Sequence, residues 1–318
     1  MLACSRASRL VLVSGAVAAL AGCCASMPDA ATTRVARSLP APLMKASPAF
    51  DPVTQDPPTP DRTFPGASHD VVFESQGSKL SGRLFTASGE GPHAAVVIAR
   101  GMPDVLGSLD VAMALRRAGV HVLSFNNRGC WGSEGNFTLR HSYEDVEAAV
   151  RYLRSEDVMK RHRVDPERIV LIGFSWGGPA VLKAAAADPR VRAVALLDGT
   201  DMRSDVDDLR AHPQEAADWL ASYPAVRTTS PRAVVDEIVA QADFWNPLGA
   251  RQGLHGKDVL VVVATQGTGA EAPQVPSLQE MFRDVARVEA VTMETTHGFD
   301  DHRLALTRTV VEWAARLR

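Results

Sequence analysis

Several features that would define a class of protein are scarce or absent in this chain of 318 residues. Four cysteines are too few for a disulfide scaffold, and Cys130 alone lies in the body of the chain, so no disulfide can form within that body. The formal net charge of −3 gives no electrostatic reason to expect a nucleic-acid partner. The nine histidines show none of the spacings typical of metal ligands, and neither a metal nor a cofactor is expected.

The composition that remains is typical of a folded globular protein. Hydrophobic residues make up 46% of the chain and charged residues 22%, which argues against extensive disorder. A chain of this length can bury a sizeable core without disulfides or metals, as one large domain or as two ordinary ones.

The first residues are typical of an export signal. Arg6 and Arg9 precede an apolar run over Leu10–Ala21, which is shorter than the roughly 20 residues needed to span a bilayer. The run leads into Leu-Ala-Gly-Cys, ending at Cys23, which resembles the lipobox at which bacterial lipoproteins are cleaved and acylated.

On this resemblance, residues 1–22 are a signal peptide, and acyl chains on Cys23 hold the protein to a membrane surface. The next residue is Cys24 rather than Asp, which by analogy with Gram-negative lipoproteins favours the periplasmic side of the outer membrane. The alternatives are an ordinary secretory signal and an uncleaved anchor.

Residues 23–63 are predicted to form a spacer. Nine of the 20 prolines lie between Pro28 and Pro65, in a stretch with almost no apolar periodicity. Proline fixes φ and removes a hydrogen-bond donor, so this stretch should be extended and semi-rigid. The folded domain is therefore expected to cover residues 64–318.

From residue 64 onward, predicted strands and helices alternate. Strands are expected over Val71–Ser75, Lys79–Ala87, Ala94–Ala99, Val120–Asn126, Arg168–Gly173, Val191–Asp198, Val259–Ala264 and Val288–Met293, and helices over Leu109–Ala118, Ser142–Ser155, Gly177–Ala187, Leu278–Ala286 and Arg303–Leu317. This alternation predicts an α/β fold, with a mostly parallel sheet and helices on both faces.

Residues 201–256 interrupt the alternation. They are polar and helix-prone, and they contain four dispersed aromatic residues: Trp219, Tyr223, Phe244 and Trp245. We expect a small helical cap that walls a pocket, and the alternative is a crossover helix with long loops.

The strongest motif is Gly-x-Ser-x-Gly at residues 173–177. A predicted strand leads into it and a predicted helix follows, which is the context of a nucleophile elbow. The turn is so tight that Gly173 and Gly177 must lack side chains, and it lifts the Ser175 hydroxyl to the N-terminus of the helix. We therefore expect Ser175 to be a nucleophile.

With this motif, residues 70–318 resemble the α/β-hydrolase family in the order of their elements. The turn after Ala94–Ala99 reads Arg-Gly-Met-Pro and is similar to the family's His-Gly-x-Pro turn, with Arg100 in place of His. The resemblance implies an oxyanion hole formed by the backbone amides of Met102 and Trp176, two donors aimed at one developing negative charge. The role of Arg100 stays open.

The loop at residues 127–133 is similar to the family's Asp-x-Arg-Gly-x-Gly-x-Ser loop. We expect it to be structural, because its glycines let it pack beneath the site. Cys130 lies within it and is expected to be a packed thiol, since Ser175 has the better sequence context for a nucleophile.

His297 is the expected base. It follows the last predicted strand and precedes the last helix, as the family's histidine does, and a loop at the carboxyl end of a strand brings it toward Ser175. The stretch His-Gly-Phe-Asp-Asp-His-Arg at residues 297–303 resembles the dienelactone-hydrolase-like and prolyl-oligopeptidase-like branches. The competing histidine, His302, is expected to start the helix and face solvent.

More than one acid is available to orient the imidazole. The family usually places this acid after the strand before last, where Glu271 is the one acid present and is the first choice. The alternatives are Asp198 and Asp201, one strand earlier. Of these, Asp198 directly ends an apolar strand and so lies at the correct edge of the sheet.

Together these residues imply a serine hydrolase that cleaves a carboxylic ester, a thioester or a short peptide through an acyl-enzyme. An ester of a small or medium acyl group is the first expectation. The alternative is a catalytically silent lipoprotein of the same fold that binds or scaffolds, because the position of the acid is poorly defined.

Overall fold

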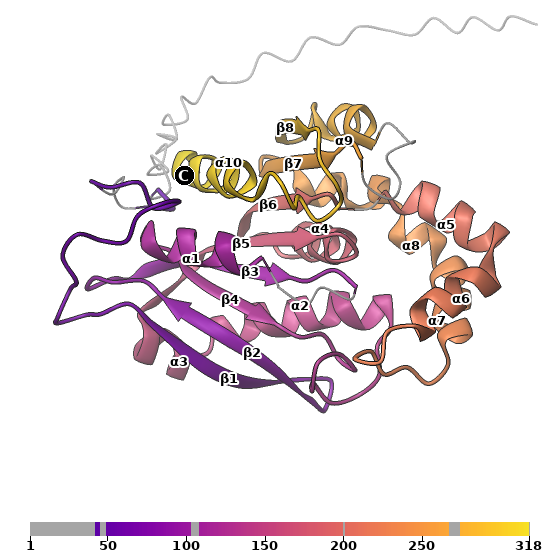
Figure 1. Ribbon diagram of the computed structural model, residues 1–318, viewed down its shortest axis with the longest axis horizontal. Helices are drawn as coiled ribbons and strands as arrows, with labels where there is room; N and C mark the ends of the chain where they lie inside the picture. The colour runs from indigo at the N-terminus through magenta and orange to yellow at the C-terminus, as the bar shows by residue number, and fades with distance from the viewer. Residues whose placement is uncertain (1–41, 45–48, 103–107, 200, 267–273, 318) are drawn as a thin grey trace, which may run out of the picture. The chain divides into compact units, whose positions relative to one another are not determined.

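An eight-stranded sheet carries the site. The computed structural model describes residues 42–44, 49–102, 108–199, 201–266 and 274–317. The strands are β1 (Ala67–Ser75), β2 (Ser78–Thr86), β3 (His93–Ala99), β4 (His121–Phe125), β5 (Val164–Phe174), β6 (Val191–Leu197), β7 (Asp258–Ala264) and β8 (Arg287–Met293). Their order in the sheet is β1-β2-β4-β3-β5-β6-β7-β8 (Figure 1). β1 and β2 are antiparallel, as are β2 and β4, and from β4 to β8 the neighbours are parallel.

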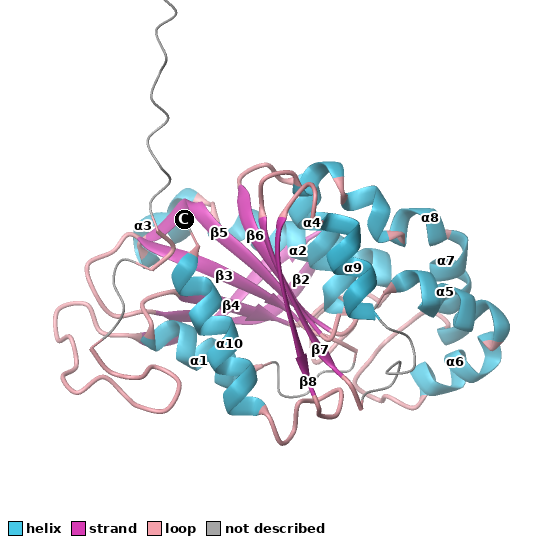
Figure 2. Ribbon diagram, turned by 90° about the horizontal axis from the view of Figure 1, so that it is seen from above, coloured by secondary structure: helices cyan, strands magenta, loops and turns pink. Residues whose placement is uncertain are grey.

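Helices cover both faces of this sheet (Figure 2). One face carries α1 (Leu109–Arg117) and α10 (Arg303–Arg316), and the other carries α2 (Leu139–Leu153), α4 (Gly177–Ala187) and α9 (Gln274–Phe282). All of β3 is buried: Val97 packs in the cluster with α2 and α4, and Val96 in the cluster with α1 and α10. A parallel strand covered on both sides has this continuous apolar sequence. The predicted fold class is confirmed.

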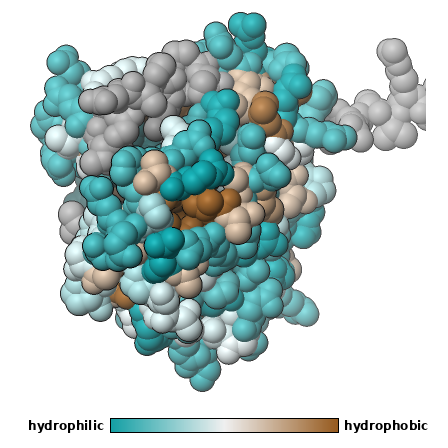
Figure 3. All heavy atoms as spheres, turned by 90° about the vertical axis from the view of Figure 1, so that its right-hand side faces the viewer, coloured by the Kyte–Doolittle hydropathy of each residue, from teal (hydrophilic) through white to brown (hydrophobic). Residues whose placement is uncertain are grey.

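The segment between β6 and β7 is helical. It contains α5 (Met202–Ala211), α6 (Pro213–Ala221), α7 (Pro231–Ala240), α8 (Ala242–Trp245) and two 3-10 turns, η1 (Pro247–Ala250) and η2 (Gln252–Leu254). Val206, Leu220 and Ile238 of these helices form an apolar cluster with Met102 and Phe137, which follow β3 and β4. The insert therefore has its own small core and packs on loops that leave the sheet. Figure 3 shows the molecule from the side on which α5, α6 and α7 lie.

One further helix, α3 (Glu156–His162), was not predicted. It follows α2 directly and buries only Val158 and His162. Two buried residues are too few to produce a visible apolar period. Every strand predicted from the sequence overlaps a strand of the sheet.

Part of the predicted spacer packs against the sheet and its helices. Leu43, Met44 and Val53 are buried in the cluster with α1 and α10, and Leu43 N donates to Leu317 O at 2.9 Å. Arg117 of α1 donates to the carbonyl of Pro52 at 2.7 Å. A spacer extended up to residue 63 would not make these contacts. The few apolar side chains of this stretch pack against the core instead. Residues 1–41 lie outside the described part of the chain. Within the described residues, no helix is long and apolar enough to cross a bilayer.

Candidate active site

Ser175 stands at a strained turn between β5 and α4. Its φ of 52° lies in the left-handed region, which a serine seldom adopts. A Cβ on Gly173 would lie 2.4 Å from Gly177 O, and a Cβ on Gly177 would lie 2.4 Å from Ala99 O. Both positions therefore require glycine, and the backbone has the geometry expected of a nucleophile elbow.

Asp198 follows the neighbouring strand. β5 and β6 are adjacent and parallel, and Ser175 N donates to Leu197 O at 3.1 Å. The Asp198 carboxylate is 8% exposed, and its Oδ1 accepts a hydrogen bond from Ala264 N at 3.0 Å. Its own N–H donates to Val262 O at 2.7 Å. These bonds fix Asp198 at the same edge of the sheet as Ser175.

His297, from the loop between β8 and α10, contacts this acid. Its Nδ1 lies 2.5 Å from Asp198 Oδ2. An ionised carboxylate only accepts hydrogen bonds, so Nδ1 carries the proton and Nε2 is left as the basic nitrogen. The imidazole centroid also lies 4.9 Å from the ring of Phe174, the residue that precedes Ser175. The structure thus brings His297 and Asp198 together beside the elbow.

The remaining candidates have other partners or are not described by the structure. Glu271 is outside the described residues. Asp201 caps α5 by accepting from Arg203 N at 3.1 Å, and its carboxylate pairs with the Arg203 guanidinium at 2.5 Å. His302 directly precedes α10, and its Nδ1 lies 3.0 Å from Asp301 Oδ1.

The turn after β3 reaches the elbow from the other side. A Cβ on Gly101 would lie 2.7 Å from the Cβ of Ser175, so only glycine allows this approach. Met102 follows and is buried, and Trp176 is the residue at the start of α4. Among the hydrogen bonds between described residues, neither the Met102 amide nor the Trp176 amide is a donor. Both amides lie next to the contact between Gly101 and Ser175.

Arg100 ties the carboxyl ends of two strands together. Its Nη1 donates to Asn126 Oδ1 at 2.9 Å, and its Nε donates to Ser124 Oγ at 3.3 Å. Both partners belong to β4 or follow it directly. The cation thus supports the turn that carries Met102.

The loop after β4 is anchored in the way expected of a structural loop. Arg128 pairs with the buried Asp145 of α2 at 2.7 Å. Gly129 has a φ of 74°, and a Cβ there would lie 2.4 Å from Arg227 O in the insert. Burial raises the pKa of the Cys130 thiol to about 12, and the Asp145 charge contributes in the same direction. The thiol therefore stays protonated at neutral pH and is a poor nucleophile.

Asp205 of α5 is a residue near the site that no motif indicates. Burial raises the pKa of its carboxyl to about 7, and the carboxylates of Asp201 and Asp208 act in the same direction. A positive charge on His297 would act in the opposite direction. The insert thus holds a carboxyl whose pKa is raised well above its usual value.

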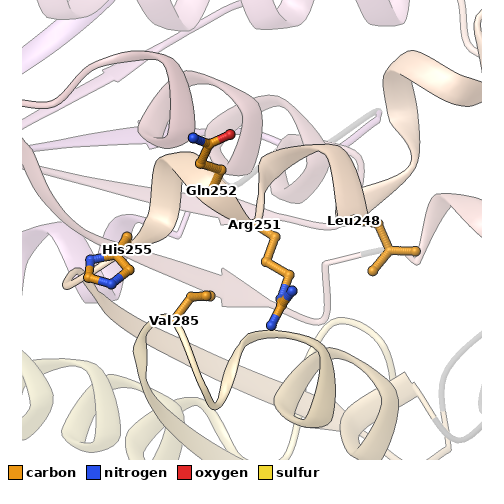
Figure 4. A pocket seen from close by; sticks show the side chains of 5 residues that line it. All are labelled: Leu248, Arg251, Gln252, His255 and Val285. Carbon is orange, nitrogen blue, oxygen red and sulfur yellow. The ribbon is translucent and has the colours of Figure 1, made fainter. Parts of the chain in front are cut away.

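A surface hollow at the opposite edge of the sheet takes no part in this site. A space of about 630 Å³ is lined by Leu248, Arg251, Gln252, His255 and Val285 (Figure 4). Gln252 and His255 precede β7, and Val285 precedes β8, so the hollow lies at the amino ends of these strands. Arg251 is held there by Asp284 and by the carbonyl of Met281.

Comparison with known proteins agrees with this fold. The family model described as "Alpha/beta hydrolase family" matches residues 96–317, and the chain therefore belongs to the α/β-hydrolase family. The match covers the sheet from β3 onward and all the residues brought together above.

Among similar curated proteins is thiohydrolase apmlB of Arthrinium phaeospermum, which is 32% identical over 137 residues, or 42% of this chain and 43% of that protein. Quorum-quenching protein AidA of Acinetobacter baumannii is 35% identical over 136 residues, or 41% of this chain and 43% of that protein. The aligned part thus spans less than half of either relative.

Solved structures resemble a larger part of the chain. Est1E from Butyrivibrio proteoclasticus superposes with a TM-score of 0.60 and 18% identity, covering 77% of this chain and 96% of its own. The Pyrococcus furiosus esterase Pf2001 superposes with a TM-score of 0.58 and 16% identity, covering 83% and 99%. At these identities the likeness establishes the fold.

Proposed function

We propose that this chain is a serine hydrolase that cleaves a carboxylic ester or thioester through Ser175, His297 and Asp198. The observation that carries the proposal is the 2.5 Å contact between His297 Nδ1 and Asp198 Oδ2, at the sheet edge where the elbow presents Ser175. An imidazole held by an acid beside the turn that carries a serine is the arrangement that activates the serine hydroxyl. Asp198 takes the role for which Glu271 was the first choice from the sequence.

The proposed reaction has two half-reactions. His297 Nε2 accepts the proton of the Ser175 hydroxyl while Oγ bonds to the carbonyl carbon of the substrate. The tetrahedral intermediate then breaks its bond to the leaving group, which takes the proton from His297. Water attacks the acyl-enzyme in the same way, releasing the carboxylic acid and restoring Ser175. Asp198 stabilises the imidazolium in both halves.

The negative charge that develops on the carbonyl oxygen needs hydrogen-bond donors. The Met102 and Trp176 amides are the proposed donors, because both flank the approach of Gly101 to Ser175 and both lack acceptors among the described residues. A single donor of this kind contributes about 3 kcal/mol to transition-state stabilisation.

The activities named for the relatives support an ester or a thioester as substrate. ApmlB is a thiohydrolase, Pf2001 is an esterase, and Est1E has a structure with ferulic acid bound. A panel of 4-nitrophenyl esters, acyl thioesters and aminoacyl amides ranks the three substrate classes by kcat/KM. We expect esters or thioesters to exceed the amides by a wide margin.

Labelling with a fluorophosphonate probe tests the function itself. We expect one adduct per chain on Ser175, no adduct in Ser175→Ala, and full labelling in the control Ser155→Ala, at an exposed position between α2 and α3. Folded protein that takes no label would favour the silent binding module. The reason for that alternative is that the sequence leaves the position of the acid open. The contact between Asp198 and His297 supports the enzyme instead.

We also propose that the chain is a lipoprotein attached to the bacterial outer membrane through Cys23. The support is the export signal that ends at this residue. Cells fed an alkyne fatty acid should label the protein, and Cys23→Ser should abolish the label and release the protein from the membrane fraction. Retained labelling in Cys23→Ser would contradict the assignment, and Cys4→Ser serves as the matched control.

A further inference from the structure

A row of aromatic rings begins at the residue after Ser175 and continues into the helical insert. Trp176 stacks on Phe137, with centroids 6.4 Å apart and 18° between the ring planes. The Trp176 ring also contacts Trp219 of α6 at 5.5 Å, and Trp219 contacts Tyr223 at 5.1 Å. We call these four residues the aromatic row.

The aromatic row becomes more exposed as it leaves the core. Phe137 is 1% exposed, Trp176 is half-buried, and Trp219 is 41% exposed. One exposed ring needs no explanation, but four rings in successive contact form a continuous apolar surface that reaches solvent at Trp219.

The position of the aromatic row relative to His297 indicates which part of a substrate it meets. His297 must protonate the leaving group, so the leaving group lies on the side of the imidazole. The imidazole packs on Phe174, whose side chain joins the cluster with α1 and α10. Trp176 joins the separate cluster of the insert. Phe174 and Trp176 flank Ser175 and turn to different clusters, so a group that extends from the carbonyl carbon away from His297 would meet Trp176.

We propose that the aromatic row binds the acyl part of the substrate, and that this acyl group carries a planar aromatic or conjugated ring. The inference rests on the proposed serine hydrolase function and names its substrate class. Planar rings stack on indole faces with a geometric preference that saturated rings of the same size lack. Trp219 is the exposed position of the row and therefore the residue that decides this preference.

Two 4-nitrophenyl esters with one leaving group test the proposal. The first carries a 3-phenylpropanoyl group and the second a 3-cyclohexylpropanoyl group, so they differ in the ring alone, which is planar and aromatic in the first and puckered and saturated in the second. We expect kcat/KM to favour the phenyl ester about fivefold, the size of one aromatic contact. Trp219→Ala should bring this ratio close to one, and Trp219→Phe should keep most of it.

Trp131→Ala is the matched control, because Trp131 is also 41% exposed but lies outside the aromatic row. It should leave the ratio at the wild-type value. A wild-type ratio near one, or a ratio that Trp219→Ala does not change, would overturn the proposal. If a fluorophosphonate still labels Ser175 in that case, the serine hydrolase function stands and only the acyl preference fails.

A binding measurement tests the aromatic row without turnover. Ser175→Ala is titrated with 3-phenylpropanoate while tryptophan emission is recorded. We expect a saturable blue shift as Trp219 is covered, and its loss when Trp219→Ala is added. No saturable shift in Ser175→Ala contradicts the aromatic row as a binding wall. A saturable shift in Ser175→Ala, together with a wild-type protein that takes no fluorophosphonate label, would leave the binding site standing while the serine hydrolase function fails.

Discussion

Replacement of Gly177 by alanine perturbs the elbow at its tightest contact. A Cβ at this position would lie 2.4 Å from Ala99 O and 2.8 Å from Arg100 O. Ordinary contacts between carbon and neighbouring heavy atoms lie near 3.5 Å, so the first contact is short by about 1 Å. Both oxygens belong to the backbone at the end of β3, and no side-chain rotation can relieve the overlap. The first turn of α4 must therefore move away from β3.

This displacement should lower both the unfolding free energy and the catalytic efficiency. Overpacking of a well-filled interior destabilises a protein by about 1–3 kcal/mol, and a contact between two backbone segments belongs at the upper end of that range. The same movement shifts Ser175 and the Trp176 amide relative to Met102. A misplacement of about 1 Å lowers catalytic efficiency by about 100-fold. We expect Gly177→Ala to lose about 2–3 kcal/mol of unfolding free energy. We expect its kcat/KM to fall by at least about 100-fold.

Urea denaturation followed by circular dichroism measures the first effect, and kcat/KM with a 4-nitrophenyl ester measures the second. Gly249→Ala is the control, because a Cβ there would meet only Nζ of Lys183, the end of a long side chain, at 3.1 Å. Its unfolding free energy should stay within about 0.5 kcal/mol of wild type. A Gly177→Ala protein with wild-type stability and activity would refute the tight approach of α4 to β3.

Three further predictions concern the acid, pH and the thiol. Asp198→Asn should lower kcat by about 10⁴-fold, because an amide favours the wrong imidazole tautomer, whereas Glu271→Gln should leave kcat within about twofold; steady-state kinetics with the opposite pattern would transfer the role to Glu271. Burial, with the nearby His93, lowers the pKa of His121 to about 3, so the folded state resists its protonation and the unfolding free energy should fall by about 1 kcal/mol for each pH unit below about 6. His121→Gln should flatten this slope in urea melts at several pH values, and an unchanged slope would contradict it. Iodoacetamide at pH 8 should leave Cys130 unmodified in the folded protein, and peptide mapping that finds it alkylated would show that the thiol is accessible and ionised.

The sheet and the nucleophile were predictable because their physical causes are local. A strand buried on both faces must be apolar throughout, as Ala94–Ala99 is, and this pattern is visible in a single sequence. The elbow around Ser175 needs glycines at two fixed positions, since any Cβ would strike the neighbouring backbone. Both signals lie within about a dozen consecutive residues, where spacing carries the information.

The acid could not be chosen from the sequence because the choice depends on contacts between distant segments. Asp198 and Glu271 each follow a strand of the same sheet, so both satisfy the local pattern. What favours Asp198 is the position of the His297 loop, whose imidazole packs on Phe174 and bonds to Oδ2. These partners are 99 residues or more away from His297 in the chain.

Other features escaped prediction for a related reason. Leu43, Met44 and Val53 are isolated apolar residues in a proline-rich stretch, and without a period they gave no sign of packing on the core. Asp205 lies in a polar helix whose charged residues look alike in sequence, and only its burial distinguishes it.

Capture of the acyl-enzyme tests the central claim most directly. The protein is mixed with a 4-nitrophenyl ester, quenched in acid within the first turnovers, digested and analysed by mass spectrometry. We predict one acyl group per chain, on the peptide that contains Ser175, and no acyl group in Ser175→Ala. Turnover that persists in Ser175→Ala, or an acyl group carried by another residue, would contradict the account.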